Sequence, residues 1–255
     1  IYINDAFSCS HRKQASIHNI AKFIKKSFAG PLMKKEINAI NLVVQNKKKP
    51  ITCIIGGSKI STKIGVITSL IEKVDNLIIV GAMANNFLEY KNLKVGKSLV
   101  ENNTKEIIEK IYKKAIENNC EIMIPDDCMV GTSFEGKGKN KDLDKIQDNE
   151  IILDIGPNTI NSIKKKIEQS KTVLWNGPAG YFENENFANG TRSIAKIISK
   201  NTMEGSLISV LGGGDTLAAI NKIKNELSFS HLSTAGGAFL EYLEGKDLPG
   251  LSVLK

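Results

Sequence analysis

Two glycine-rich turns hold the side chains best suited to phosphate chemistry. The stretch GGSKISTK at 56–63 follows an apolar run and carries Lys59 and Lys63. The stretch LGGGDT at 211–216 follows another apolar run and carries Asp215. Glycine lets backbone N–H groups approach an anion closely, and the start of a following helix adds partial positive charge. We therefore expect the two turns to form one cradle for a polyphosphate.

The lysine pair and the aspartate each have two interpretations. A spacing of four places Lys59 and Lys63 on one face of a helix that begins within the stretch, where anions are favoured; the other interpretation is two surface lysines. Asp215 is expected at a helix N-cap, a feature that contributes about 1 kcal/mol. It is equally suited to bind Mg²⁺, which takes few carboxylates and completes its shell with phosphate and water. Thr216 adds a hydroxyl at the same helix start.

Three further residues are candidates for ligand contacts. In WNGPAGYFE, Asn176 lies in the loop after a strand, and Glu183 either accepts ribose hydroxyls or is a solvated loop acid. Trp175, the only tryptophan, fits a core position. In NDAFSCSHR, Arg12 is either a fork for a carboxylate or phosphate or an ordinary arginine.

Strand-like runs alternate with helical patterns from about residue 50 onward. The runs are β-branched and nearly continuous, as in parallel strands that are buried on both faces. They are PITCIIGG, NLIIVG, EIMIP, TVLWNGPAG and SLISVLGGG. We therefore predict an α/β fold with a Rossmann-like, doubly wound parallel sheet. Ligands of such sheets bind beyond the carboxyl ends of the strands, which is where the glycine turns stand.

Helices and loops connect these strands. A long helix is predicted over Pro31–Val44, because proline suits the first helical turn and apolar residues recur along one face. Another helix is expected at about 185–199. The polar segment 131–150 is interpreted as a surface excursion within the same domain.

The composition narrows the class of protein. With 41% hydrophobic and 24% charged residues, the 255-residue chain is typical of a globular α/β protein. Its longest apolar runs are strand-sized, so no membrane-spanning segment is predicted. Four scattered cysteines without a CxxC pair indicate a reducing compartment and no structural metal site.

The net charge of +8 is concentrated in one part of the chain. Residues 1–50 hold ten Lys/Arg and two Asp/Glu, whereas the remaining residues hold 25 of each sign. Such a basic surface either attracts a small polyanion or is a simple solvated face. Nucleic acid is disfavoured as a partner, because no aromatic residues interleave with the lysines for base stacking.

Two common nucleotide motifs are missing from the sequence. Gly96-Lys97-Ser98 ends like a Walker A motif, but Lys91 stands where its first glycine belongs. The run Gly212–Gly214 lacks the later glycine of GxGxxG, which disfavours an NAD-type oxidoreductase. The phosphate cradle is therefore neither an ordinary P-loop nor a dinucleotide turn.

Seven motifs taken together resemble those of phosphoglycerate kinase. They occur in the family's order and span the chain from end to end. The resemblance implies two Rossmann-like domains joined by a long helix, one binding 3-phosphoglycerate and the other binding Mg²⁺ with ADP or ATP. The motifs are NDAFSCSHR, LMKKE, GGSKISTK, VGAMANNF, WNGPAGYFE, LGGGDT and HLSTAGGAFLEYLEGKDLPG.

The resemblance also implies a role for each candidate residue. Lys59 resembles the catalytic lysine that follows the transferring phosphoryl group, and Arg12 resembles an arginine that binds phosphoglycerate. Asp215 would bind the metal. The other implied nucleotide-binding positions are Gly56, Gly57 and Gly81 at the adenine slot, Lys63, Asn176, Gly213, Gly214 and Thr216 at the phosphates, and Glu183 at the ribose.

The implied activity is reversible phosphoryl transfer between 1,3-bisphosphoglycerate and ADP, which gives 3-phosphoglycerate and ATP in glycolysis. The implied partners are these small molecules, with no nucleic acid or membrane, and we expect a cytoplasmic monomer. The expected parts are the end of a phosphoglycerate-binding domain (1–29), an interdomain helix (30–47), the nucleotide domain (48–232) and a hinge with a returning tail (233–255).

The sequence departs from the family pattern in places. The family's upstream substrate residues, which include further arginines and a histidine, are not in this chain, so we expect it to lack most of the N-terminal domain. The alternative function is therefore an Mg–ADP/ATP-binding module without turnover. Ala82 and Ala235 replace family glycines, and Ala235 would resist a positive φ if its turn requires one.

Overall fold

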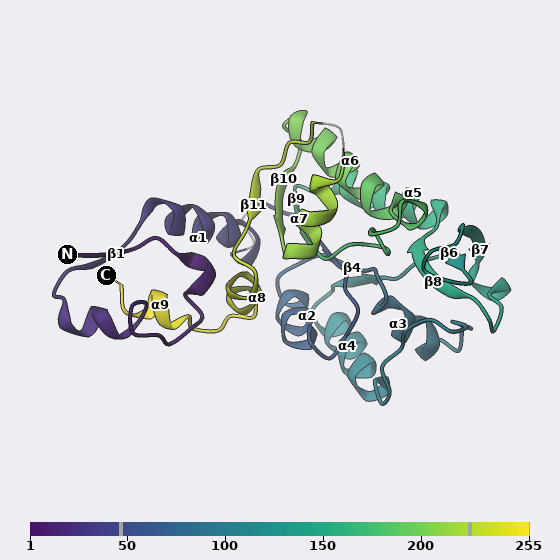
Figure 1. The fold of residues 1–255 in the computed structure, drawn as a ribbon, viewed down its shortest axis with the longest axis horizontal. Helices are drawn as coiled ribbons and strands as arrows, with labels where there is room; N and C mark the ends of the chain where they lie inside the picture. The colour runs from purple at the N-terminus through teal and green to yellow at the C-terminus, as the bar shows by residue number, and fades with distance from the viewer. Residues whose placement is uncertain (46–47, 224–225, 255) are drawn as a thin grey trace.

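A six-stranded parallel sheet is the central element of the computed structural model, which describes residues 1–45, 48–223 and 226–254 (Figure 1). Each strand pairs with its neighbours in the parallel sense. In spatial order the strands are β11 (His231–Ser233), β10 (Ile208–Gly212), β9 (Thr172–Asn176), β3 (Ile51–Ile55), β4 (Asn76–Ile79) and β5 (Glu121–Met123).

Helices cover both faces of this sheet because its strands are apolar on both sides. Along β3, Cys53 and Ile55 belong to one core and Ile54 belongs to the other. The first core is covered by α1 (Pro31–Val44), α2 (Ile64–Ile71), α3 (Ala84–Tyr90), α4 (Lys105–Glu117) and α8 (Gly237–Leu243). The second is covered by α5 (Pro157–Gln169), α6 (Asn189–Met203) and α7 (Gly214–Asn221). The predicted doubly wound α/β fold is confirmed.

The predicted helices agree with the structure to different degrees. The helix over Pro31–Val44 is confirmed as α1. The wider interval 30–47 includes residues 46 and 47, which lie outside the described residues. The helix expected at about 185–199 is displaced, since Glu185–Phe187 form a separate 3₁₀ turn, η4, whose N-cap Asn184 accepts a bond from the Asn186 amide. Helix α6 therefore begins only at Asn189.

A second, antiparallel sheet lies beside the main one and was missed by the sequence patterns. It is formed by β7 (Lys139–Asp142), β6 (Asp127–Gly131) and β8 (Ile151–Ile155) in that spatial order, with the short 3₁₀ turn η3 (Leu143–Lys145) after β7. Strand β7 reads KNKD and is largely exposed, so it has no apolar signature. The segment 131–150 is thus polar, as expected, but part of it is ordered as a sheet edge.

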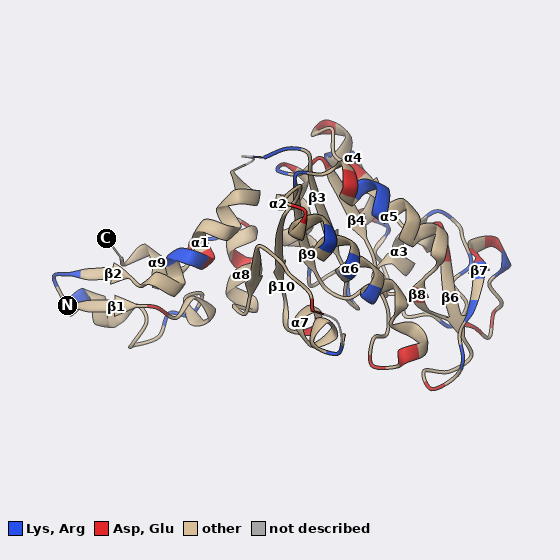
Figure 2. Cartoon of the chain, turned by 90° about the horizontal axis from the view of Figure 1, so that it is seen from above, with Lys and Arg blue, Asp and Glu red and all other residues tan. Residues whose placement is uncertain are grey.

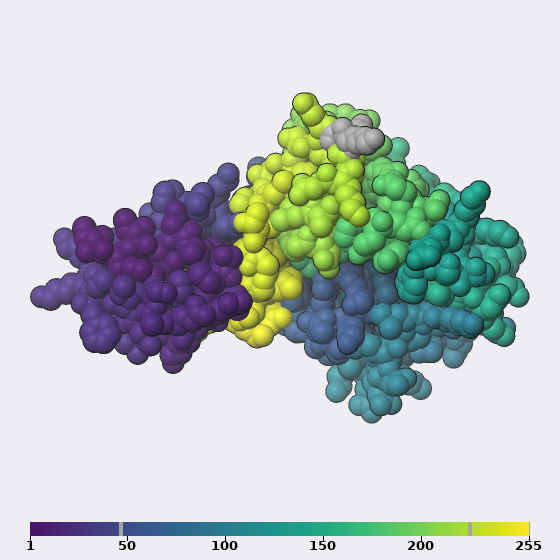
Figure 3. Space-filling model, viewed as in Figure 1, coloured from purple at the N-terminus to yellow at the C-terminus, as the bar shows by residue number. Residues whose placement is uncertain are grey.

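The two ends of the chain pack together at the end of the molecule that lies away from the main sheet (Figure 1). Strands β1 (Tyr2–Asn4) and β2 (Ser27–Ala29) form a parallel pair, with 3₁₀ turns η1 (Phe7–Cys9) and η2 (Asn19–Phe23) between them. Helix α9 (Pro249–Ser252) returns to this pair, because the Gly250 amide donates to the Ser10 carbonyl at 2.7 Å and Asn4 Nδ2 donates to the Gly250 carbonyl at 3.3 Å. Figure 3 shows the C-terminal stretch lying between the N-terminal residues and the main sheet.

A buried hydrogen bond between a histidine and a carboxylate ties α1 to β11. His231 Nε2 lies 2.9 Å from Glu36 Oε2, and both side chains are largely buried. Burial alone would raise the pKa of Glu36, but hydrogen bonds from His231 and Ser233 outweigh it, so the pKa of this carboxyl lies below its usual value. Glu36 is therefore ionised at neutral pH, and it joins the helical connector to the edge of the main sheet.

Seven basic residues of the N-terminal fifth lie around β1 and β2 and on α1 (Figure 2), and Lys48 and Lys49 follow α1. The seven are Arg12, Lys13, Lys22, Lys25, Lys26, Lys34 and Lys35. None of the described helices has both the length and the apolar character that a bilayer crossing requires.

Candidate functional site

Glycine turns follow four neighbouring strands of the main sheet, β10, β9, β3 and β4, and meet at its carboxyl edge. Each turn contains one glycine with φ between +70° and +139°, a conformation that L side chains rarely adopt. A Cβ on Gly177 would lie 2.2 Å from the Gly56 carbonyl oxygen, so the turns after β9 and β3 are in direct backbone contact. The positive-φ glycines of these turns are Gly57, Gly81, Gly177 and Gly213.

Asn176, at the end of β9, links three of these turns. Its Oδ1 accepts a hydrogen bond from Lys63 Nζ at 2.5 Å, and its Nδ2 donates to the Gly212 carbonyl at 2.8 Å. Beside it, Thr216 Oγ1 accepts from the Gly177 amide at 2.7 Å and donates to the same Gly212 carbonyl at 3.0 Å. The sequence candidates Lys63, Asn176 and Thr216 are therefore brought together.

Lys63 is a half-buried cation at the centre of the cradle. Its side chain lies against Gly57, because a Cβ on that glycine would be 3.3 Å from Lys63 Cε. Burial lowers the pKa of Lys63, and the nearby Asp215 carboxylate is among the groups that oppose this shift. A desolvated ammonium next to backbone amides is well suited to hold an anionic group.

The expected placement of the two lysines on one helix face is wrong. Helix α2 begins at Ile64, Lys63 is its N-cap, and Lys59 lies in the exposed loop before it. Local turn bonds hold this loop out of the helix: the Lys63 amide donates to the Ile60 carbonyl, and Thr62 Oγ1 donates to the Lys59 carbonyl, each at 2.9 Å. Only Lys63 contacts Asn176.

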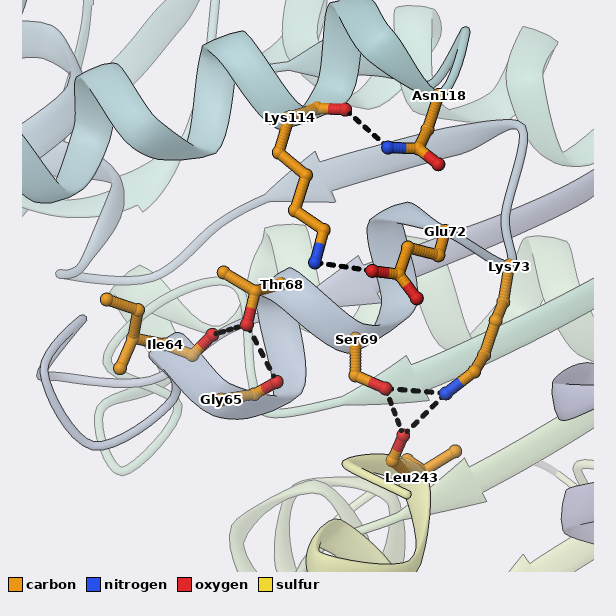
Figure 4. Close-up of polar contacts among 9 residues, drawn as sticks. All are labelled: Ile64, Gly65, Thr68, Ser69, Glu72, Lys73, Lys114, Asn118 and Leu243. Atoms are coloured by element: carbon orange, nitrogen blue, oxygen red, sulfur yellow. Dashed lines mark hydrogen bonds and ion pairs between the residues drawn. The ribbon is translucent and has the colours of Figure 1, made fainter. Parts of the chain in front are cut away.

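The opposite end of α2 is fixed by a polar cluster (Figure 4). Ser69 Oγ donates to the Leu243 carbonyl of α8 at 2.9 Å, and Lys73 Nζ donates to both Ser69 Oγ (2.5 Å) and that carbonyl (3.3 Å). Toward α4, Glu72 pairs with Lys114 at 2.5 Å. Helix α2, which follows Lys63, is thus held between α4 and α8.

Asp215 is not the N-cap that the sequence suggested. Gly213 is the N-cap of α7, with φ +102°, and Asp215 is the second residue of the helix, with no side-chain capping bond. A positive φ favours glycine at the cap position, and the carboxylate therefore lies two residues beyond the cap, inside the helix. Asp215 is exposed and lines the cavity beside the glycine turns.

A cavity of about 430 Å³ adjoins these turns. Its lining includes the sequence candidates Gly57, Gly81, Glu183 and Asp215. The sequence patterns missed its apolar wall, which is formed by β8, Leu99 and an edge-to-face pair of Phe134 and Tyr181 with ring centroids 5.1 Å apart. The run IILDIGP, an apolar stretch ending in Gly-Pro, was the available signal. An apolar slot beside anion-binding turns suits a nucleoside.

Arg12 lies apart from this cradle, in the turn after η1. Its Nε donates to His11 Nε2 at 3.4 Å, and it is not among the residues that line the cavity. His11 in turn faces the start of α8, where a Cβ on Gly237 would lie 3.6 Å from its Nε2. Ala235 does not have a positive φ, since Gly236 takes that conformation (φ +55°), so alanine fits this turn.

The carboxylate of Asp215 fits a Mg²⁺ ion that holds a nucleotide, because a hard oxygen ligand next to a phosphate cradle is the usual arrangement for this metal. In the described parts of the chain, no group of three or more His, Cys, Asp or Glu side chains is arranged to hold a metal ion by itself. Asp215 lies at the edge of the cradle, where its carboxylate would be available to such an ion.

Comparison with known proteins gives one consistent family. The family model for phosphoglycerate kinase matches residues 1–246. The phosphoglycerate kinases of Wolbachia pipientis subsp. Culex pipiens and of Coxiella burnetii are 47% and 43% identical, over 98% and 100% of this chain. This chain spans 64% of the length of each of these curated relatives.

Solved structures agree in fold. The phosphoglycerate kinase structure from Coxiella burnetii superposes with a TM-score of 0.93 at 42% identity and covers 98% of this chain. The one from Pyrococcus horikoshii OT3 gives a TM-score of 0.82 at 30% identity over 99% of this chain. The match extends over 64% and 63% of those two chains, respectively.

Proposed function

Because the chain belongs to the phosphoglycerate kinase family, we propose that it carries the Mg–ADP/ATP-binding part of an enzyme that transfers a phosphoryl group between 1,3-bisphosphoglycerate and ADP. The observation that supports this most directly is the cradle itself. Four adjacent strand ends bring together glycine turns and the Lys63 ammonium, and an apolar slot lined by Gly57, Gly81 and the Asp215 carboxylate adjoins them. Such a site matches a ligand with an apolar base at one end and several negative charges at the other.

The proposed roles follow from position. The slot beside Gly56, Gly57 and Gly81 receives the base, and Glu183 accepts ribose hydroxyls. Asn176, Gly213, Gly214 and Thr216 hold Lys63 and the backbone amides toward the phosphates. Bound Mg²⁺ would neutralise charge on the phosphates, with Asp215 as its protein ligand.

In such a transfer the protein forms few or no covalent bonds with the substrates. The rate therefore depends mainly on how the protein positions them and stabilises the charge of the transferring group. Lys59 extends from a loop that is not part of α2, and we assign it to the transferring phosphoryl group. Arg12, on the N-terminal part, is assigned to the phosphoglycerate. Residues 1–29, 30–47, 48–232 and 233–255 correspond to the end of the phosphoglycerate-binding domain, the interdomain helix, the nucleotide domain, and the hinge with its tail. We place the protein in the cytoplasm as a monomer.

The metal role of Asp215 is testable by calorimetry. Asp215→Asn should weaken binding of Mg–ADP about tenfold, because a charged contact is lost, and should change binding of ADP in EDTA far less. Asp148→Asn is the matched control, since Asp148 is exposed and lies in a different loop. An affinity for Mg–ADP that is equal in the wild type and Asp215→Asn would exclude the metal role.

Turnover distinguishes the full reaction from its alternative, a nucleotide-binding module. In a coupled assay with 3-phosphoglycerate and Mg–ATP, we expect this 255-residue chain to show negligible turnover while still binding Mg–ADP. The Coxiella burnetii enzyme serves as the positive control. Robust turnover by the chain would contradict the expectation that upstream substrate residues are required.

A further inference from the structure

A buried carboxylate, Asp154, belongs to the β8 part of the cavity lining and was not among the sequence candidates. It stands on β8 and is 2% exposed. Its Oδ2 accepts a hydrogen bond from the Gly190 amide at 2.7 Å, and its Oδ1 accepts one from the Ile155 amide at 2.9 Å. Gly190 belongs to the first turn of α6, whose amides lack partners within the helix. Asp154 therefore anchors the start of α6 to β8.

The cavity wall is attached to the same two elements. Residues 178–183, which line the cavity, connect β9 to η4 and α6. The Ala179 amide donates to Thr191 Oγ1 in the first turn of α6 at 2.9 Å. The Tyr181 amide donates to the Leu153 carbonyl of β8 at 2.7 Å. The wall is thus attached both to the first turn of α6 and to β8, which are the two elements that Asp154 joins.

The Asp154 carboxylate also fills the space between wall and helix. A Cβ on Gly180, in the wall, would lie 2.3 Å from Asp154 Oδ1. A Cβ on Gly190, in the helix, would lie at the same 2.3 Å from that oxygen. The carboxylate is in close contact with both backbones, and any change in its position displaces one of them.

We propose that Asp154 is a positioning residue for the nucleotide slot: by holding the first turn of α6 against β8, it sets the position of the 178–183 wall. This inference rests on the proposed function, which supplies the ligand. Asp154 itself is not assigned a contact with the phosphates or with the metal. Its effect should therefore be confined to the end of the ligand that carries the base.

The protonation state of Asp154 provides a readout that a purely structural residue would lack. Burial raises the pKa of Asp154 to about 7, although main-chain hydrogen bonds and Arg192 oppose the shift. The ionised carboxylate accepts hydrogen bonds at both oxygens, whereas in the protonated form one oxygen carries a hydrogen and becomes a donor. Its partner on β6 is the uncharged Met129. The other charged or titratable groups around the wall and the cavity are Glu183, Glu185, Tyr181, Lys97, Asp215 and the Cys128 thiol.

Adenosine is the probe for this proposal, because it fills the slot but has no phosphate and does not titrate near neutral pH. In the wild-type chain, we expect its affinity to rise between pH 6 and pH 8. In Asp154→Asn, the affinity at pH 8 should be about tenfold weaker, since a hydrogen bond to a charged group is lost, and it should not change with pH. Binding is followed by NMR titration or calorimetry, with folding checked by circular dichroism.

Asp127→Asn is the matched control. Asp127 is also a buried carboxylate at a helix start: it accepts hydrogen bonds from the Asn158 and Thr159 amides of α5 at 2.9 and 2.8 Å. It does not line the cavity. We expect Asp127→Asn to reduce thermal stability but to retain the wild-type affinity and its pH dependence.

The outcomes separate this proposal from the proposed function. Wild-type affinity for adenosine in Asp154→Asn at every pH, or an equal loss in Asp127→Asn, would overturn the positioning role. A wild-type chain that binds neither adenosine nor Mg–ADP would instead contradict the proposed function. If Asp154→Asn does not fold, Thr191→Val removes the other attachment of the wall; a severalfold loss of adenosine affinity supports the role, and an unchanged affinity overturns it.

Discussion

Replacement of Trp175 by alanine should remove about 3–5 kcal/mol from the free energy of unfolding, which is the usual range for a buried aromatic side chain. Trp175 is fully buried in the second core, on β9 near the middle of the main sheet. Its indole N–H donates to the Gly177 carbonyl at 2.7 Å. Since single domains are stable by about 5–15 kcal/mol in total, this one change should remove a large share of the stability of the domain.

Urea denaturation followed by far-UV circular dichroism measures this loss. Trp175→Phe separates the two contributions: it keeps most of the apolar volume, loses the N–H, and should cost about 1–2 kcal/mol. Phe23→Ala is the surface control, because Phe23 is 87% exposed, and it should change stability by less than about 0.5 kcal/mol. A loss below about 1 kcal/mol in Trp175→Ala would show that β9 is not packed as described.

Replacement of Lys63 by methionine should weaken Mg–ADP binding about a hundredfold, which corresponds to about 2.7 kcal/mol. The ammonium is half-buried, and Asn176 already orients it at 2.5 Å. A phosphate would therefore meet a charge that is partly desolvated and needs little reorganisation. Methionine keeps a similar length and removes only the charge and the donors, so the packing against Gly57 should survive.

Lys59→Met is the control for this prediction. Lys59 lies in the exposed loop before α2 and is assigned to the transferring phosphoryl group, so its loss should change Mg–ADP affinity by less than about threefold. Calorimetry at constant ionic strength compares the two variants. Equal losses would mean that both lysines hold the nucleotide, and a larger loss in Lys59→Met would exchange their roles.

The sequence was most informative where local pattern and global fold agree. Strands β3 and β9 are continuous apolar runs because both of their faces are covered, and α1 begins and ends at the residues that its proline and apolar spacing indicated. The glycine turns were also predictable, since they stand directly after these strands. Strand β7 was not, because a short polar edge strand is specified by its pairing with β6 and not by its own composition.

The details of the site depend on contacts between distant residues, and these set the limit of prediction. The Asn176 partner of Lys63 lies 113 positions away, so no local spacing could show which lysine enters the cradle. Asp154 stands inside an apolar strand, and its Gly190 partner lies 36 positions away. Asp215 is not the N-cap of α7, because Gly213 takes that position with a positive φ. Three consecutive glycines in a sequence do not show which of them will be the cap.

The contact between α9 and β1 also affects the order in which parts of the chain can fold during synthesis. Asn4 and Gly250 are separated by 246 positions, so the first strand emerges from the ribosome long before its partner exists. At about 5–20 residues per second, it waits roughly 12–50 s. The main sheet can close during this interval, whereas the hydrogen bonds that join β1 to α9 cannot form before Gly250 has been made. During this interval the part of the chain around β1 is incompletely folded and open to chaperone binding.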